Sequence, residues 1–281
     1  MKILVTGISS ALGTIIARKL SENHEVIGLS KRKVKGFKTI SFDLGSTKEL
    51  RIGSVDVCVH LAFITSPEIC EKDTMAYRVN VLGTKKLLEY CRKTKVKKFV
   101  FISTGGVYGF SNKPLTESMK PRPFDAYSSM KYKAEKTAKN YSKYFDVVVL
   151  RYFFPYGPGT KKDSLINRLI NNINEGKKIT LHNGGKPVIN PIFIGDLAQA
   201  TALFCINDFK GFNIFNIAGP EKASIREISL MISSITGKKQ VFKKSNKACR
   251  DMVASISKLS RYRKPKTKLK EGLKITIDYL R

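Results

Sequence analysis

The chain has 281 residues, with 52 lysines and arginines against 22 aspartates and glutamates, and a formal net charge of +30. This length suits one large domain, or a nucleotide-binding domain with a smaller lobe, whose core needs no disulfide or metal for stability. No apolar run approaches the roughly 20 residues of a membrane-spanning helix, so no membrane association is expected. The five cysteines show no CxxC spacing and the chain opens on a strand-like run without a signal peptide, which predicts a cytoplasmic protein.

The large positive charge is consistent with a nucleic-acid partner, an anionic surface or a lysine-rich solvated exterior. Lysines and arginines are scattered along the whole chain and become denser after Gly237, without an aromatic RNA motif or a Cys/His finger. We therefore predict no nucleic-acid partner, but a basic exterior that attracts phosphorylated substrates. The three histidines lie far apart and lack metal-ligand spacing, so no metal site is predicted.

Strand-like and helical segments alternate through the first two-thirds of the chain, which is typical of a parallel sheet wrapped by helices. The predicted strands are Lys2–Thr6, Glu25–Ser30, Val55–Leu61, Lys98–Ser103 and Asp146–Arg151. The predicted helices are Ala11–Ser21, Met75–Thr94 and Tyr127–Tyr144. Shorter segments separated by Gly, Pro and Asn follow. We predict an α/β fold: a doubly wound parallel Rossmann sheet over residues 1–152, to which later segments return, and a smaller substrate-binding lobe over residues 153–281.

The segment Thr6–Gly13 follows the first predicted strand and leads into a helix. Gly7 permits the tight strand-to-helix turn, and Gly13 lets the helix pack closely, so that free N–H groups face a pyrophosphate. Ser10 stands where a third glycine is usual, and a plain tight turn is the alternative interpretation.

The second predicted strand ends in Leu29-Ser30-Lys31-Arg32-Lys33, where an acidic residue normally accepts the adenosine ribose hydroxyls. Absence of the acid and presence of cations favour a 2′-phosphate, and therefore NADP. The abundance of lysine in this chain explains the same residues equally well, so both NAD and NADP stay open.

Three Tyr-x-x-x-Lys pairs occur in the chain: Tyr127/Lys131, Tyr132/Lys136 and Tyr262/Lys266. Residues four apart share a helical face, so the ammonium is expected to lower the pKa of the phenol from about 10 and make it a general acid and base. A lysine-rich chain produces this spacing by chance, so the spacing alone does not choose among the three.

Sequence context selects Tyr127. A strand ending at Ser103-Thr104 runs into Gly105–Gly109, about 20 residues before Tyr127. Because ligands gather at the carboxyl ends of the strands in such sheets, Thr104 is expected beside Tyr127, where its hydroxyl polarises a carbonyl. The other two pairs have no such partner. A buried structural tyrosine is the alternative.

Taken in order, these motifs resemble the extended short-chain dehydrogenase/reductase family, in its branch of NAD-dependent nucleotide-sugar epimerases, dehydratases and reductases. The resemblance covers nearly the whole chain and rests on these segments: Thr6–Gly13, Asp43-Leu44, His60–Ala62, Asn80–Thr84, Ser103–Gly109, Tyr127/Lys131, Leu150–Phe153, Tyr156–Pro158, Asn190–Ala198, Phe215–Gly219 and the tail from Ile256 to Leu273.

The resemblance implies that Thr104, Tyr127 and Lys131 are catalytic. It also implies cofactor contacts from the loop Leu61–Thr65 and from Asn80, although Asn80 is equally consistent with a buried structural amide and Asp43 with a turn residue. The residues expected to bind the cofactor are Gly7, Ser9, Ser10, Ala11, Leu12, Gly13, Ser30, Arg32, Asp43, Leu44, Leu61, Ala62, Phe63, Asn80, Ser103, Tyr127, Lys131 and Phe153.

Departures from the family pattern narrow the expected reaction. A 4,6-dehydratase would carry an Asp-Glu pair after the catalytic Thr, and Gly105-Gly106 stand there instead. Phe154 replaces the Asn that touches the substrate diphosphate in many members. We therefore predict an NAD(P)-dependent nucleotide-sugar epimerase, in which Tyr127 takes the hydroxyl proton and hydride leaves and returns.

Two other functions stay open. An NADP-dependent ketoreductase or dehydrogenase of a sugar nucleotide, or of another small carbonyl compound, would use the same residues once. A non-catalytic dinucleotide-sensing or RNA-associated protein would keep the fold without turnover. The resemblance also implies a homodimer through the helices at 75–94 and 127–144, with Leu87, Leu88, Ala134 and Ala138 at the interface, although packing within one chain explains the same pattern.

Overall fold

The computed structural model describes residues 1–281 and divides them into two compact units. The first unit is formed by Met1–Tyr108, Lys120–Arg151 and Ala198–Phe215. The second is formed by Gly109–Met119, Tyr152–Leu197 and Asn216–Arg281. The segment 198–215 thus belongs with the N-terminal part of the chain, and the segment 109–119 with the C-terminal part.

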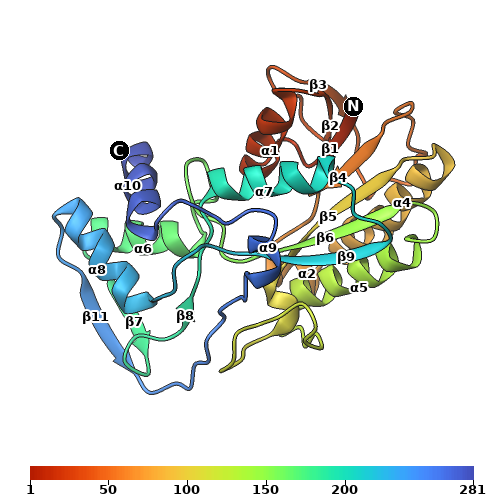
Figure 1. The fold of residues 1–281 in the computed structure, drawn as a ribbon. Helices are drawn as coiled ribbons and strands as arrows, with labels where there is room; N and C mark the ends of the chain where they lie inside the picture. Colours follow the sequence, from red (N-terminus) through yellow and green to blue (C-terminus); the bar gives the residue numbers. More distant parts are fainter. The chain divides into compact units, whose positions relative to one another are not determined.

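The first unit is built on a seven-stranded sheet with the order β3-β2-β1-β4-β5-β6-β9 (Figure 1). The strands are β1 (Lys2–Thr6), β2 (Glu25–Ser30), β3 (Lys38–Ser41), β4 (Val57–His60), β5 (Lys98–Thr104), β6 (Asp146–Tyr152) and β9 (Phe212–Ile217). β1 lies between β2 and β4 and pairs in parallel with both. β2 also pairs in parallel with β3, and β4 also pairs in parallel with β5. This is the strand order of the doubly wound dinucleotide-binding fold, and the predicted fold class is confirmed.

Helices cover both faces of this sheet, with α1 on one side and α4 and α5 on the other (Figure 1). The helices of this part of the chain are α1 (Ala11–Ser21), α2 (Pro67–Lys72), α3 (Thr74–Tyr77), a π-helical turn (Arg78–Leu82), α4 (Gly83–Lys93), a 3-10 turn (Gly105–Tyr108), α5 (Ala126–Asn140) and α7 (Ile194–Ile206). Alternate strand residues face opposite sides, so Leu4, Cys58 and Phe99 join one core cluster with Leu87 and Leu88 of α4.

The segment predicted as a helix over 75–94 is helical from Thr74 to Lys93, but it contains a π-helical turn between α3 and α4 that was not predicted. Asn80 lies in that turn, and its side-chain amide accepts a hydrogen bond from the backbone N–H of Ile64 and donates one to the Ile64 carbonyl. β3 was not predicted because it is a four-residue edge strand without a fully buried side chain. The interface expected at Leu87, Leu88, Ala134 and Ala138 is also corrected, since all four side chains are fully buried within one chain.

The second unit contains short elements tied together by buried polar side chains. Its elements are α6 (Leu165–Asn174), β7 (Lys178–His182), β8 (Val188–Ile189), β10 (Ala223–Ser224), α8 (Ile225–Thr236), β11 (Val241–Ser245), α9 (Ser257–Ser260) and α10 (Leu269–Leu280). β10 pairs antiparallel with β8, and β11 pairs parallel with β7. The amide of Asn190 bonds both backbone groups of Ala254, and Asp196 accepts from the backbone N–H groups of Lys266 and Thr267.

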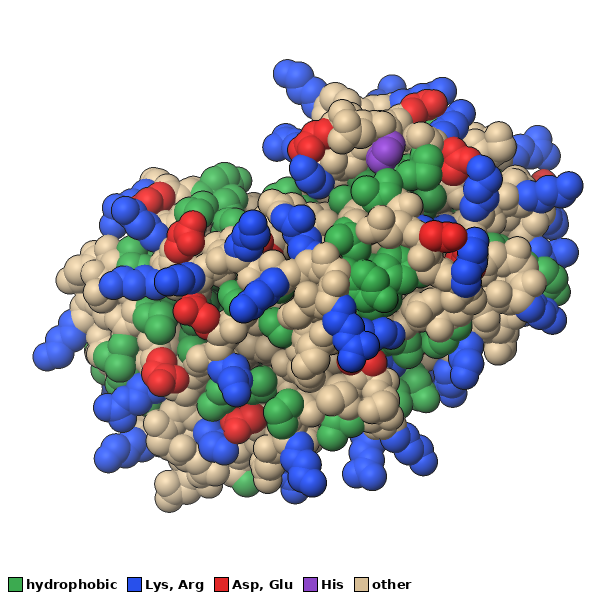
Figure 2. Space-filling view, viewed as in Figure 1, with side chains coloured by type: hydrophobic (Ala, Val, Ile, Leu, Met, Phe, Trp, Pro, Cys, Tyr) green, Lys and Arg blue, Asp and Glu red, His purple; other side chains and the backbone are tan.

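Lysine and arginine side chains are spread over the whole face of the molecule in Figure 2, with single acidic side chains among them. Most of the ion pairs join side chains at exposed positions, as the pair of Glu68 and Lys72 does. Such pairs stabilise the fold little. None of the helices combines the length and the apolar composition that crossing a bilayer requires.

Candidate active site

The turn between β1 and α1 leaves no room for side chains at two positions. Gly7 has a φ of +70°, and a Cβ on it would lie 2.8 Å from the backbone nitrogen of Ala62. A Cβ on Gly13 would lie 2.3 Å from the carbonyl oxygen of Gly7. Ser10 caps α1, since its Oγ accepts from Gly13 N at 3.0 Å, so a third glycine is not needed. The cradle fits a pyrophosphate, which the first N–H groups of α1 would bind.

Replacing Gly13 with Ala is expected to lower the free energy of unfolding by about 1–3 kcal/mol, because the added methyl overlaps the Gly7 carbonyl. The same shift would displace the turn and weaken dinucleotide binding. Urea denaturation and calorimetric titration with NAD measure the two effects. Arg18→Ala, at an exposed position of the same helix, serves as the control and should change neither. Unaltered binding by Gly13→Ala would contradict this role of the turn.

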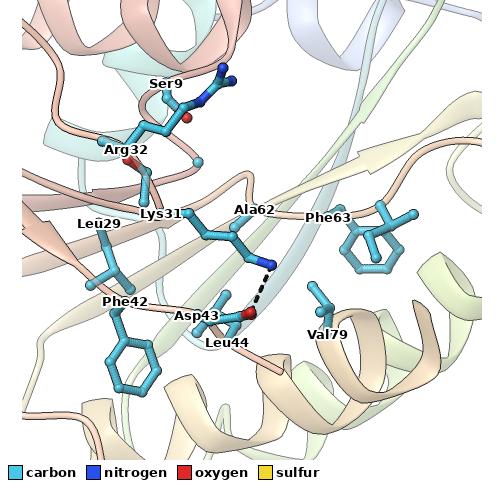
Figure 3. Close-up of a pocket in the computed structure, with 13 residues that line it drawn as sticks. Ser9, Leu29, Lys31, Arg32, Phe42, Asp43, Leu44, Ala62, Phe63 and Val79 are labelled. Atoms are coloured by element: carbon cyan, nitrogen blue, oxygen red, sulfur yellow. Dashed lines mark hydrogen bonds and ion pairs between the residues drawn. The ribbon is translucent and has the colours of Figure 1, made fainter. Parts of the chain in front are cut away.

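A cavity of about 250 Å³ continues from this turn across the carboxyl ends of β1, β2 and β4. Eight residues predicted to bind the cofactor line it (Figure 3): Gly7, Ser9, Ser30, Arg32, Asp43, Leu44, Ala62 and Phe63. Ile64, in the predicted loop Leu61–Thr65, also lines it, and four further lining residues were not among the predicted cofactor-binding residues: Leu29, Lys31, Phe42 and Val79. Each adjoins a predicted residue in sequence, which is the signal that could have found them. The cavity has the composition expected of an adenosine site, apolar with a few polar groups.

The other predicted cofactor residues lie outside that lining. Ser10, Ala11, Leu12 and Gly13 form the turn and the first residues of α1. Leu61 donates its N–H to Thr6 Oγ1 at 3.2 Å. Ser103 is buried, and its Oγ donates to Glu135 Oε1 at 2.5 Å. Phe153 is buried in the second unit, where its N–H donates to the carbonyl of Ile217.

Buried polar contacts fix the loop after β4 that forms one wall of the cavity. Asn80 Oδ1 accepts from Ile64 N at 2.7 Å, and Asn80 Nδ2 donates to Ile64 O at 3.0 Å. His60 lies between Thr6 and Thr84, with ring-nitrogen to hydroxyl distances of 2.7 and 2.9 Å. Burial lowers the pKa of His60 to about 3, with a further contribution from the charge of Lys131. His60 is therefore neutral and structural.

Tyr127 and Lys131 lie one turn apart near the start of α5. Asp125 caps this helix together with Ser128. The Tyr127 ring meets Phe63 edge-on at 6.0 Å, and Lys131 Nζ lies 3.7 Å from the centroid of the same Phe63 ring. Phe63 lines the cavity. The Tyr127/Lys131 pair therefore shares a wall with the predicted dinucleotide site.

Thr104 ends β5 and is close to the first turn of α5. Its Oγ1 accepts from Gly106 N at 3.1 Å. A Cβ on Gly106 would lie 3.5 Å from Thr104 Oγ1 and 3.4 Å from Ser128 Cβ. Gly106 therefore lies between the Thr104 hydroxyl and the helix that carries Tyr127. The structure thus places Thr104 close to Ser128 in the first turn of α5, and the pairing of its hydroxyl with Tyr127 stays a prediction.

The predicted lowering of the Tyr127 pKa by Lys131 is not found. Burial raises the pKa of Tyr127 above its usual value, and the charge of Asp125 adds to the rise. Lys131 Nζ donates instead to the carbonyl of Ile102 at 2.5 Å, over the rings of Phe63 and Phe101. Burial also lowers the pKa of Lys131 to about 7. The pair is thus a phenol and an amine held in an apolar wall, each favouring its neutral form.

This burial predicts a pH-dependent effect of Lys131→Met on stability. The pKa is 10.5 for an ordinary lysine and about 7 here, so between these values the unfolded chain binds a proton that the folded chain does not. The stability of the wild type relative to the variant should therefore rise as pH rises from about 7 to about 10.5. The variant should be the more stable protein near pH 6, by a few kcal/mol.

Urea denaturation of the cofactor-free protein at several pH values measures this difference. Lys136→Met, at an exposed position of the same helix, is the control and should show no such trend. A difference between wild type and Lys131→Met that is constant with pH would contradict the shifted pKa.

A second buried charge cluster lies one turn further along α5. Glu135 binds Arg151 of β6 through two contacts, from Nε to Oε1 at 3.0 Å and from Nη2 to Oε2 at 2.6 Å. Both side chains are almost fully buried. Burial lowers the pKa of Arg151, but the hydrogen bond and charge of Glu135 outweigh it and leave the pKa raised. This cluster links α5, β5 and β6 behind Lys131.

The fold and these side chains define a class of protein: a dinucleotide-binding α/β protein with a Tyr-x-x-x-Lys pair beside the nucleotide cavity. A family model described as the NAD dependent epimerase/dehydratase family matches residues 3–218, and the chain belongs to that family. The predicted family is thereby confirmed.

Individual relatives agree with this family. The chain is 29% identical to the uncharacterized UDP-glucose epimerase YtcB of Bacillus subtilis, over 100% of this chain and 98% of that protein. It is 27% identical to the UDP-glucuronate 4-epimerase of Thermodesulfobacterium geofontis, over 98% and 95%. Among solved structures, UDP-glucuronic acid 4-epimerase from Bacillus cereus, in complex with UDP-glucuronic acid and NAD, superposes with a TM-score of 0.89 at 28% identity, covering 100% of this chain and 99% of that one.

Proposed function

We propose that the chain is a nucleotide-sugar epimerase that inverts a secondary alcohol of a sugar with the help of a nicotinamide dinucleotide. The observation that carries this proposal is the Tyr127/Lys131 pair on α5, held against the Phe63 wall of the dinucleotide cavity. Relatives that act on UDP-glucose and UDP-glucuronic acid support UDP-hexoses as the first substrates to test.

In the proposed mechanism Tyr127 Oη takes the proton of the reacting sugar hydroxyl and later returns it. The Thr104 hydroxyl donates to the same sugar oxygen and holds it while the carbon is planar. Lys131, with a pKa of about 7, is protonated in part of the molecules at neutral pH, and in that form it would supply the positive charge that a buried phenol needs to release its proton. A dinucleotide held by the turn at Gly7 and by the cavity that Ala62 and Phe63 line would supply the hydride acceptor and donor that an inversion without net oxidation requires.

Two related reactions differ in the groups they need. Dehydration is disfavoured because Gly105 and Gly106 carry no acid or base at the positions after Thr104. A single reduction of a keto sugar by NADPH is the second candidate, and the cations Lys31 and Arg32 in the cavity favour it.

Mass spectrometry of the dinucleotide released on denaturation, followed by assays with UDP-glucose and UDP-glucuronic acid, tests the proposal. Formation of the 4-epimer without added cofactor, or with catalytic amounts of it, is the expected result. Stoichiometric oxidation of NADPH by keto sugars would favour the reductase instead, and absence of any dinucleotide binding would overturn both.

A homodimer and a cytoplasmic location are part of the same proposal. Met75, Tyr77 and Leu82 are 39%, 40% and 50% exposed on the segment expected to form the interface, and they are better candidates for it than the buried leucines of α4. Light scattering of the purified chain tests the dimer. A monomeric mass at micromolar concentration would contradict it.

A further inference from the structure

A second cavity lies in the first unit, outside the candidate active site. Its volume is about 400 Å³, against about 250 Å³ for the cavity predicted to bind the dinucleotide, and the two cavities share no lining residue. One side of it is formed by residues 47–53, in the connection between β3 and β4. The other side is formed by α4, through Lys86, Glu89, Tyr90, Lys93 and Thr94. A cavity of this size is large enough to enclose a small-molecule ligand.

The connection between β3 and β4 is long and irregular. Residues 42–56 contain neither a helix nor a strand, and no backbone N–H group of residues 49–55 donates a hydrogen bond within the chain. Connections of about 12–15 residues or more without secondary structure are uncommon in compact domains, and those that occur are usually functional. The free N–H groups beside the cavity are hydrogen-bond donors for an anionic ligand.

Cations outnumber carboxylates in the lining of this second cavity. The cations are Lys48, Arg51, Lys86 and Lys93, and the acidic residues are Glu49 and Glu89. Glu49 pairs with Arg51 and Lys93, but its oxygens are 3.7 and 3.9 Å from their nitrogens, too far for hydrogen bonds. Glu89 is bound by side chains outside the lining, and the ammonium of Lys48 forms no ion pair. The lining therefore offers cations whose hydrogen bonds are free for an anion.

Apolar side chains complete the lining. Leu50 and Tyr90 are buried, and Ile52 is partly buried. The Tyr90 hydroxyl donates to the carbonyl of Gly53, which ties the end of the connection to α4. Cations suit a phosphate, whereas an apolar wall with an aromatic ring suits the flat face of a sugar or a base. The lining therefore has the composition of a site for a small phosphate monoester.

Lys86 connects the second cavity with the dinucleotide cavity. Its Nζ donates to the carbonyl of Lys48 at 3.2 Å and to that of Ser46, and it lies 5.6 Å from the centroid of the Phe42 ring. Phe42 and Asp43 line the dinucleotide cavity (Figure 3). The same connection thus forms part of both cavities. A ligand that orders it in one cavity leaves a smaller entropy loss for binding in the other.

We propose that the second cavity is an effector site for a small phosphate monoester, in which Lys48, Arg51 and Lys93 hold the phosphate, and that its occupancy raises the affinity of the neighbouring cavity for the dinucleotide. Such coupling is reciprocal, so the dinucleotide also raises the affinity for the monoester. The coupling rests on the dinucleotide binding that the proposed function requires, whereas the binding of the monoester does not.

Calorimetric titration of the full-length chain with glucose 1-phosphate and with UMP tests the site. We expect at least one of them to bind with a Kd below about 1 mM, and more weakly as salt is raised. The tighter of the two identifies a sugar or a nucleoside as the body of the ligand. Lys48→Ala and Arg51→Ala should each lower that affinity by about tenfold. Lys85→Ala, at an exposed position of α4 outside the lining, is the control and should change nothing. Saturating monoester should strengthen NAD binding by about fivefold in the wild type, but not in the Lys48→Ala/Arg51→Ala double variant.

The outcomes separate this inference from the proposed function. Absence of binding by both monoesters, or affinities that Lys48→Ala and Arg51→Ala leave unchanged, would overturn the site even if the chain epimerises UDP-hexoses. Binding of the monoester without any change in NAD affinity would overturn the coupling. A folded chain that binds the monoester but no dinucleotide would overturn the proposed function and leave the site standing.

Discussion

Tyr127→Phe is expected to lower the epimerisation rate by about 10²–10⁴-fold while leaving the fold intact. Phenylalanine keeps the edge-on contact with Phe63 and removes only the hydroxyl that exchanges a proton with the sugar. Turnover of UDP-glucose and UDP-glucuronic acid, followed by chromatography of the epimers, measures the loss. Dinucleotide binding by the variant should persist, because Tyr127 does not line the adenosine cavity.

Tyr132→Phe is the matched control, since Tyr132 and Lys136 repeat the same spacing on the same helix. Lys136 Nζ lies 5.1 Å from the Tyr132 ring centroid, but Lys136 is exposed and neither residue contacts Phe63. This variant should retain wild-type turnover. Equal losses in both variants, or full activity in Tyr127→Phe, would remove Tyr127 from the mechanism.

Arg151→Met is expected to destabilise the protein by about 3–5 kcal/mol, the largest effect on stability we predict. The substitution removes both Arg151 hydrogen bonds to the buried Glu135 carboxylate. Of the side chains that now donate to Glu135, only the Ser103 hydroxyl would stay. An isolated buried charge is costly, whereas the intact pair contributes little net stability. The free energy of unfolding from urea denaturation measures the change.

The double variant Glu135→Leu/Arg151→Met should recover much of that loss, because it removes both charges together. Lys72→Met, which breaks the exposed pair with Glu68, is the surface control and should cost less than about 1 kcal/mol. Losses in the double variant equal to the sum of the single losses would show that the pair is not coupled.

Much of the fold follows from local patterns in the sequence. β1, α1 and β2 occur at the predicted residues, because their apolar runs are flanked by Gly7 and by polar turn residues. β3 was missed since an edge strand with half-exposed polar residues has no apolar pattern. The π-helical turn was missed as well, because it depends on the bonds between Asn80 and the distant backbone of Ile64.

The candidate site was predictable where a motif is continuous in sequence. The glycine turn and the spacing of Tyr127 and Lys131 are of that kind. The direction of the Lys131 ammonium was not predictable, because it depends on the carbonyl of Ile102 and the ring of Phe63, which only the folded sheet brings near it. The ion pair between Lys31 and Asp43 joins the segment after β2 to the segment after β3, and neither segment's sequence indicates it.

The chain crosses from one compact unit to the other after residues 108, 119, 151, 197 and 215. Each unit is therefore made of three separate segments, and neither can be isolated by truncation or moved to another protein by a single gene fusion. A fragment ending at residue 152 would lack β9 and leave β6 as an unprotected edge, open to aggregation. The chain must close long loops before either unit is complete, which predicts slow folding and a protein inherited whole rather than assembled from interchangeable modules.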